Sequence, residues 1–192
     1  MAKRSVLFVS HVSSKKLGGA ELVLDDLLAG INRDRFDTVL LLQKPLDSNT
    51  DLNWDCSANT VIEYFDFGAL GHRNKFIALF GLLYRVIKGL FYIPYIVKKH
   101  DIDIIYANSL IAGIFTVIPA KLLGKRFFYH EHNIAEQRKG HLIGVALGPV
   151  AKLATGIVCI SNSVKESLVR SGIALNKLHL VYNGYEFSRL DK

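Results

Sequence analysis

The chain alternates short, continuous apolar runs with longer stretches in which apolar residues recur at helical spacing. Continuous runs of this length are typical of strands buried on both faces of a parallel sheet, and a spacing of three and four residues is typical of helices. Helices are predicted over Ala20–Ile31, Ser109–Leu123 and Asn162–Ser171. Strands are predicted over Ser5–Ser10, Thr38–Gln43, Thr60–Phe65, Ile102–Ala107, Arg126–His132, Gly156–Ser161 and Leu178–Tyr182.

Strands joined by helices of this length form βαβ units. The pattern therefore predicts an α/β, Rossmann-like three-layer domain with a parallel sheet of about seven strands. Thr60–Phe65 alternates more than the other runs, and we expect it near an edge of the sheet.

Two segments depart from this rhythm. Asp47–Asn59 is polar and reads as a surface loop, whereas Phe76–Val97 is almost wholly apolar. Arg85 and Lys88 in the middle of the apolar segment argue against a transmembrane helix, since each would cost about 2.5–3.5 kcal/mol in a bilayer core. Two alternatives remain: a core helix packed on the sheet, or a helix lying in the membrane interface as a peripheral contact.

Composition narrows the classes of partner. The formal net charge of +7 favours phosphate-bearing molecules or an anionic membrane surface. The chain has no arginine-rich helix and no basic stretch interleaved with stacking aromatics, so nucleic acid is not expected as a partner. Cys56 and Cys159 lie far apart and in no metal-ligand spacing, which favours reduced thiols. No stretch near the N-terminus has the pattern of a secretory signal, and we expect a cytoplasmic protein, at the inner face of the membrane if the apolar helix is interfacial.

The first predicted strand leads through a loop into Gly18-Gly19 at the start of a helix. Paired glycines permit a positive φ and let a ligand approach the backbone closely. A helix N-terminus offers free N–H groups to an anion, and doubly wound sheets bind ligands at the carboxyl ends of their strands. A purely structural turn is the alternative. The spacing is not the GxGxxG of dinucleotide-binding enzymes.

A second candidate site is the sequence Tyr129-His130-Glu131-His132-Asn133 at the end of a predicted strand. Period-two alternation places His130 and His132 on one face and Glu131 on the other. The two histidines can bind a sugar hydroxyl or phosphate, or transfer a proton near neutral pH. A metal site is not expected, because a catalytic zinc normally takes three protein ligands and no third is suitably spaced.

Two further turns follow predicted strands. Ser161 or Ser163 is expected to cap the next helix, with Glu166 in capping-box spacing from Ser163. Asn183-Gly184 is a turn signal near the end of the chain.

These motifs, in order, are Gly-Gly-Ala-Glu, Asp-Ile-Asp-Ile-Ile-Tyr-Ala-Asn, a strand ending in histidine, Ile-Val-Cys-Ile-Ser-Asn-Ser and Val-Tyr-Asn-Gly-Tyr-Glu. Together they resemble the N-terminal domain of the retaining GT-B glycosyltransferases of family 4. The resemblance implies one half of a GT-B fold, with an acceptor-binding domain over residues 1–184. Residues 185–192 would begin the hinge to a C-terminal, donor-binding domain.

The resemblance also implies roles for individual residues. His132, with His130 as the second candidate, would contact the transferred sugar. Substrate-binding positions would be Gly18, Gly19, Glu21, Asn108, Asn133, Ser161, Ser163 and Asn183. No metal or cofactor is implied, the nucleotide sugar being a substrate.

We therefore expect the acceptor-binding half of a glycosyltransferase, acting on a glycan or lipid-linked acceptor and inactive without a donor-binding half. That half would be a C-terminal domain or a partner chain, and the chain itself a fragment, a truncated product or one subunit of a split enzyme. Two alternatives are a non-catalytic, membrane-recruiting subunit and a generic Rossmann-like ligand-binding domain.

Overall fold

The fold is a single seven-stranded sheet in the order β3-β2-β1-β4-β5-β6-β7, with every neighbouring pair parallel. It comes from a computed structural model that describes residues 3–12, 18–45, 60–68, 75–135 and 142–184. The strands are β1 Arg4–Val9, β2 Phe36–Gln43, β3 Val61–Phe65, β4 Ile104–Ala107, β5 Arg126–Glu131, β6 Gly156–Cys159 and β7 Leu178–Leu180. This confirms the predicted α/β class and the edge position of the third strand.

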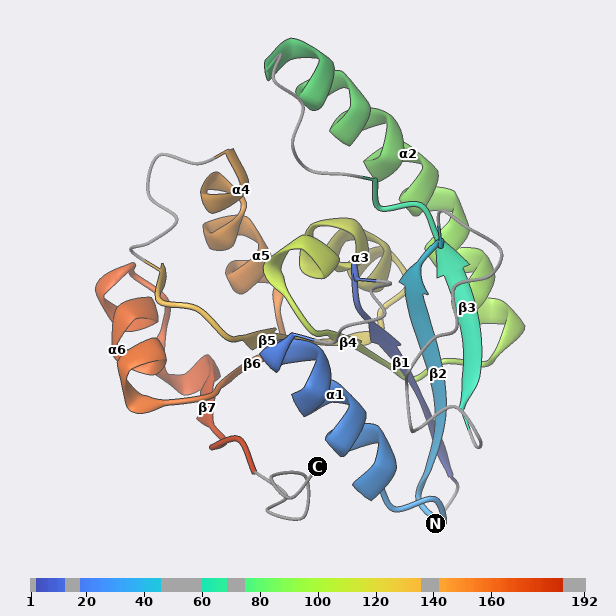
Figure 1. Ribbon diagram of the computed structural model, residues 1–192, viewed down its shortest axis with the longest axis horizontal. Coiled ribbons are helices and arrows are strands. Elements are labelled where there is room, and N and C mark those ends of the chain that lie inside the picture. The colour runs from blue at the N-terminus through green and yellow to red at the C-terminus, as the bar shows by residue number, and fades with distance from the viewer. Residues whose placement is uncertain (1–2, 13–17, 46–59, 69–74, 136–141, 185–192) are drawn as a thin grey trace.

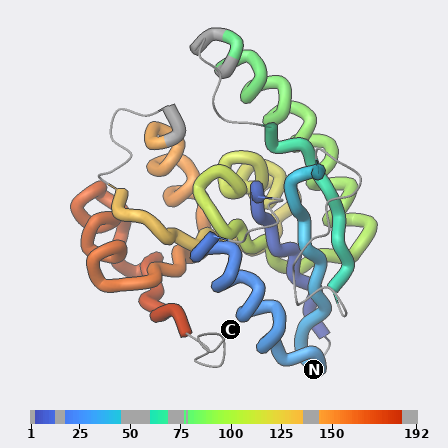
Figure 2. Tube along the Cα trace, viewed as in Figure 1, coloured from blue at the N-terminus to red at the C-terminus, as the bar shows by residue number. Residues whose placement is uncertain are grey.

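Helices lie on both faces of the sheet (Figures 1 and 2). Helix α1 covers one face, where it packs Leu24 and Leu28 against Phe8 of β1 and Leu40 of β2. The hydrophobic core on the other face is larger, and α2, α3, α5 and α6 cover it. The helices are α1 Gly19–Gly30, α2 Lys75–Lys99, α3 Leu110–Leu122, α4 Leu142–Val145, α5 Leu147–Leu153 and α6 Asn162–Arg170, with a short 3-10 turn, η3, over Leu175–Lys177.

This division of the helices follows from chain order. Right-handed crossovers place the helix between β1 and β2 on one side of the sheet, and those that follow β3 on the other once the strand order reverses. Strand β1 therefore lies beside β4, and the reversal between them marks the carboxyl edge as the ligand-binding position of a doubly wound sheet.

Helix α2 packs one face into the core, as the first of the two alternatives predicts. Ile93, Ile96 and Val97 are at most 4% exposed and belong to the core on the sheet. The face opposite carries a stripe of large exposed side chains, called here the α2 stripe: Phe80, Tyr84, Ile87, Phe91 and Tyr95. The N-terminal part of the helix extends beyond the sheet (Figure 1). Leu79–Lys99 is long and apolar enough to cross a membrane by length and composition alone, a test that core helices also pass.

Three sequence-based expectations need correction. Among the described glycines, positive φ occurs at Gly68, Gly124 and Gly172 and not at Gly18 or Gly19. The predicted capping box at Ser163 is absent, because Ser161 is the N-cap of α6 and Ser163 lies within its first turn. Helices α4 and α5 were not predicted. The loop predicted at 47–59, Cys56 and the hinge at 185–192 lie outside the described residues.

Candidate functional site

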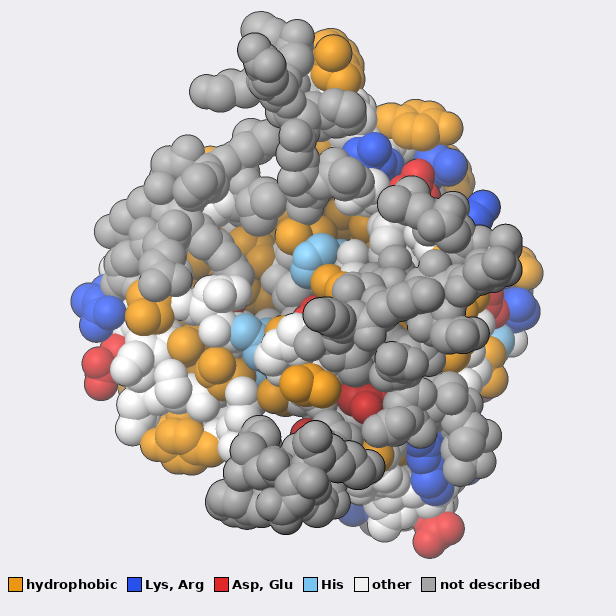
Figure 3. Space-filling view, viewed as in Figure 1, with side chains coloured by type: hydrophobic (Ala, Val, Ile, Leu, Met, Phe, Trp, Pro, Cys, Tyr) orange, Lys and Arg blue, Asp and Glu red, His pale blue; other side chains and the backbone are white. Residues whose placement is uncertain are grey.

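Polar side chains from three separate parts of the chain meet at the carboxyl edge of β1, β4 and β5. We call them the histidine cluster: His11, Asn108, Ser109, His130 and His132. The rings of His130 and His132 are 4.0 Å apart, which confirms that they share a face. Figure 3 shows histidine side chains reaching the surface among hydrophobic ones.

His132 is held by a hydrogen bond to the residue that follows the neighbouring strand, β4. Its Nε2 lies 3.2 Å from Oδ1 of Asn108, which directly follows β4. The Asn108 amide nitrogen donates to the carbonyl of Ala20, 2.9 Å away in the first turn of α1. Asn108 is only 1% exposed. A single buried amide thus couples the candidate sugar-contacting histidine to the start of α1.

His130 lies on β5 two residues before His132, is more deeply buried, and stays neutral. Its Nδ1 is 2.8 Å from the Tyr106 hydroxyl, and the ring is 4% exposed. Burial, aided by the neighbouring His132, lowers the pKa of His130 to about 3. Burial also raises the pKa of Tyr106, so the phenol keeps its proton. Within the described chain, Nε2 of His130 has no hydrogen-bond partner.

His130 also lines a groove on the α1 face of the sheet, although its Nε2 is itself buried. This groove has a volume of about 700 Å³, and its walls come from α1, from β4 to β6 and from the segment after β7. Leu27 and Val158 provide apolar surface, and Tyr182 and Asn183 also line the groove. Asn183 and His130 therefore face a common groove.

His11 is a part of the cluster that sequence reasoning missed. Its Nδ1 is 3.0 Å from Oγ of Ser109, and burial lowers the pKa of His11. Ser109 also caps α3, since its Oγ accepts from the Ala112 amide at 3.1 Å. The available signal was position: His11 lies two residues past the end of β1, just as Ser109 lies two residues past the end of β4.

Glu131 serves the fold. It is 1% exposed, it accepts a hydrogen bond from the Tyr129 hydroxyl, and its Oε1 accepts from the backbone N–H of Asn133 at 3.0 Å. The carboxylate thereby holds the turn that follows β5. The Asn133 side chain is exposed at this turn. Burial, together with the charge of Glu131, raises the pKa of the Cys159 thiol to about 11, so this cysteine stays protonated.

The paired glycines leave room for other groups at the start of α1, because they have no side chain. Gly18 is the N-cap in extended geometry, and a Cβ there would lie 2.7 Å from the Glu21 carboxylate. Glu21 is 8% exposed and folds back toward the helix start. A Cβ on Gly19 would meet none of the described residues within 4 Å, so these residues leave the helix N-terminus open to a ligand.

The α6 turn lies at the end of β6, farther along the same edge. Ser161 accepts from the Val164 amide at 3.3 Å, and Ser163 is exposed. Capping accounts for Ser161. In the part of the chain that the structure describes, no three His, Cys, Asp or Glu side chains form a group that could hold a metal ion.

Known structures share this fold. HepE of Anabaena in complex with UDP-glucose is 21% identical, with a TM-score of 0.69 over 96% of this chain and 45% of that one. The lipopolysaccharide outer core galactosyltransferase WaaB is 16% identical, with a TM-score of 0.65 over 96% of this chain and 46% of that one. A UDP-GlcNAc 2-epimerase from Methanocaldococcus jannaschii is 16% identical, with a TM-score of 0.58 over 95% and 46%. The chain spans less than half the length of each.

Fold alone does not separate transferases from epimerases. The α/β Rossmann-like sheet and its GT-B neighbours define the class as the N-terminal domain of a GT-B protein. The profile of Glycosyltransferase Family 4 matches residues 17–189, so the chain belongs to this family. A comparison with curated protein sequences gave no match.

Proposed function

We propose that this domain is the acceptor-binding half of a glycosyltransferase that moves a sugar from a nucleotide-sugar donor to a glycan or lipid-linked acceptor. The histidine cluster at the carboxyl edge carries the proposal. Its groups converge from β1, β4 and β5 at the edge where doubly wound sheets bind ligands. HepE was solved with UDP-glucose and WaaB is named a galactosyltransferase, which supports a nucleotide sugar as donor.

In this proposal each group has a distinct part. His132, held by Asn108, hydrogen-bonds a hydroxyl of the transferred sugar. Neutral His130 supplies its Nε2 to a ligand in the adjoining groove, and the open N-terminus of α1 at Gly19 faces the donor phosphates. A donor-binding half, from the same polypeptide or a partner chain, completes the site, because transfer needs groups aligned on both sides of one sugar.

The division of labour is tested by calorimetric titration of UDP, GDP and their common sugar conjugates into this chain. We expect negligible heats from a domain whose folding is verified by circular dichroism. Tight binding of one nucleotide would mean that this domain holds the donor, and the proposal would be wrong. A His132→Ala variant, equally folded, is the matched control for any weak binding that involves the cluster.

The α2 stripe supports a second element of the proposal, peripheral contact with the cytoplasmic face of a membrane. Its five side chains are each more than half exposed, and they follow one face of the helix at spacings of three and four residues. Exposed apolar patches of this kind mark interaction sites, and a basic amphipathic helix suits an anionic bilayer surface. The basic residues of the same helix are Lys75, Arg85, Lys88, Lys98 and Lys99.

Vesicle flotation tests the contact. The variant Phe80→Ser with Ile87→Ser should bind anionic vesicles at least about tenfold more weakly, since each side chain contributes about 1.5–3 kcal/mol when fully buried. Leu122→Ser with Val145→Ser is the matched control, because both side chains are 75% exposed and lie on other helices. Equal binding by all three proteins would refute the contact.

A further inference from the structure

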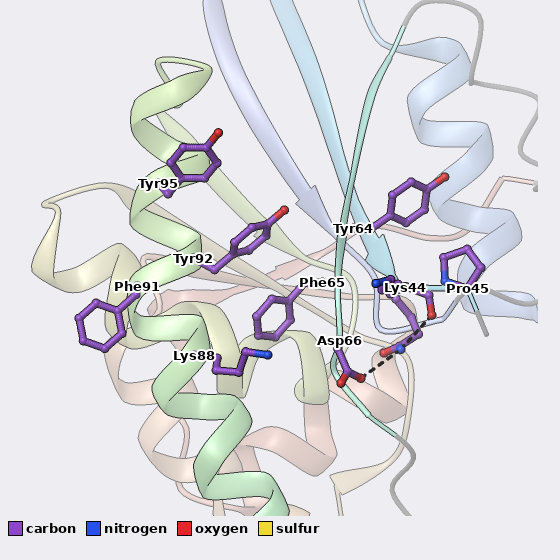
Figure 4. A pocket seen from close by; sticks show the side chains of 10 residues that line it. Lys44, Pro45, Tyr64, Phe65, Asp66, Lys88, Phe91, Tyr92 and Tyr95 are labelled. Carbon is purple, nitrogen blue, oxygen red and sulfur yellow. Dashed lines mark hydrogen bonds between the residues drawn. The ribbon is translucent and has the colours of Figure 1, made fainter. Parts of the chain in front are cut away.

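A second groove lies between α2 and the carboxyl ends of β2 and β3, away from the histidine cluster. Its volume is about 770 Å³. Phe65 forms its floor and stacks on Tyr92 with ring centroids 5.5 Å apart and an interplanar angle of 26°. Figure 4 shows Lys88 and Tyr92 extending from α2 toward Phe65 and Asp66 of the β3 end.

The wall formed by the β3 end is held in place. Oε1 of Gln43 accepts from the backbone N–H groups of Phe67, at 2.8 Å, and Gly68, at 3.2 Å. Nε2 of the same side chain donates to Asp66 at 3.4 Å. One glutamine side chain therefore ties the strand ends together, and the groove is a built feature of the fold.

The charges in the groove favour an anion. Lys44 and Lys88 line it, and neither forms an ion pair with a carboxylate in the described chain. The carboxylate of Asp66 already accepts from Gln43. Two lysines and one aspartate leave a formal charge of +1, which complements the single negative charge of a phosphodiester.

The groove is continuous with the α2 stripe. Phe91, 76% exposed, and Tyr95, 56% exposed, belong to both. The Lys88 ammonium also lies 5.3 Å from the ring centre of Tyr84, another stripe residue. Aromatic rings at the boundary of an apolar surface, with lysines beside them, match the composition of the bilayer interface.

We infer that this groove binds the phosphate-bearing headgroup of an anionic phospholipid, with its acyl chains directed along the α2 stripe into the bilayer. Lys44 and Lys88 pair with the phosphodiester, and the rings of Phe65 and Tyr92 pack against the glycerol backbone. The inference rests on the proposed membrane contact and assigns it a specific lipid partner. A single bound lipid fixes the rotation of the domain about α2, which a stripe alone does not.

The test uses monomeric lipid, so that it does not depend on a membrane. Dihexanoyl phosphatidylglycerol, kept below its micelle concentration, is titrated into the 15N-labelled chain. We expect saturable shifts of the Lys44, Asp66, Lys88 and Tyr92 amides. Binding should be about 25-fold weaker in Lys44→Gln with Lys88→Gln, from about fivefold per lysine. The control Lys121→Gln with Lys152→Gln removes the same charge from exposed lysines of α3 and α5 and should bind like wild type.

Three outcomes would overturn the inference: equal weakening in both double variants, equal binding of dihexanoyl phosphatidylcholine, or saturation of the same amides by inorganic phosphate at equal affinity. Flotation separates this inference from the membrane proposal. If wild type fails to bind vesicles but binds the monomeric lipid at the groove, the membrane contact fails and the groove stands. If vesicle binding is lost only in the stripe variant and monomeric lipid does not bind, the groove fails alone.

Discussion

The histidine cluster and the α2 stripe are both surfaces of one domain, but they are built in opposite ways. The cluster gathers residues from distant parts of the chain, and one of its hydrogen bonds joins His11 to Ser109, 98 positions away. The stripe comes from a single helix and has a surface of exposed aromatic and aliphatic side chains. A converging polar edge can orient one small ligand, whereas an apolar stripe suits an extended, fluid partner. In the proposed function, the domain thus keeps substrate binding and membrane attachment on separate surfaces.

The largest expected effect is a difference in stability between variants on the buried face and on the exposed stripe of α2. Ile93→Ala should lower the free energy of unfolding by about 2–5 kcal/mol, because Ile93 is fully buried against the sheet. Ile87→Ala, six residues earlier and 54% exposed, should change it by less than about 0.5 kcal/mol. Urea unfolding of both variants decides the matter. A large loss in Ile87→Ala would show that the stripe is covered by the domain itself.

A second test compares two asparagines of the site. Asn108→Ala removes the buried bridge between His132 and the Ala20 carbonyl and should destabilise the domain by about 1–3 kcal/mol. Asn133→Ala is its control: this side chain is exposed, so a change below about 0.5 kcal/mol is expected. Thermal and urea unfolding measure both. Equal stabilities would mean that the cluster is not held together by Asn108.

The fold was largely predictable because buried parallel strands are continuous apolar runs, and all seven runs became strands of the sheet. His130, His132 and Asn108 were also predictable as a group, since strand ends share an edge. The pairings of His11 with Ser109, His132 with Asn108 and His130 with Tyr106 were not predictable, because they depend on β1 lying beside β4 and β4 beside β5. The sequence also could not show which face of α2 is buried, since apolar residues surround most of the helix and both the buried face and the exposed α2 stripe are hydrophobic.

The histidine cluster should also make stability depend on pH, which the stripe should not. The pKa of His130 is about 3 in the folded state, below the ordinary value near 6.5. Between these two values the unfolded chain binds one more proton at this residue, so stability falls as pH falls. The loss approaches roughly 1.4 kcal/mol per pH unit below about pH 6.

Urea unfolding at pH 7, 6, 5 and 4 checks this dependence. His130→Gln should flatten the slope over this range by the stated amount. His179→Gln is the control, because His179 is exposed, and it should keep the slope of the wild type. A slope that survives in His130→Gln would assign the acid sensitivity to other groups, such as His11, whose pKa is also lowered by burial.

The smallest effect concerns the two serines at the start of α6. It tests whether helix capping alone accounts for Ser161 at this edge of the sheet. Ser161→Ala should lower the free energy of unfolding by about 1 kcal/mol, because its hydroxyl caps the Val164 amide. Ser163→Ala should change it by less than about 0.5 kcal/mol, since Ser163 is exposed within the first turn. Paired urea titrations resolve a difference of this size. If both variants are as stable as wild type, capping does not explain Ser161, and a ligand at this helix start becomes the reason to have a hydroxyl there.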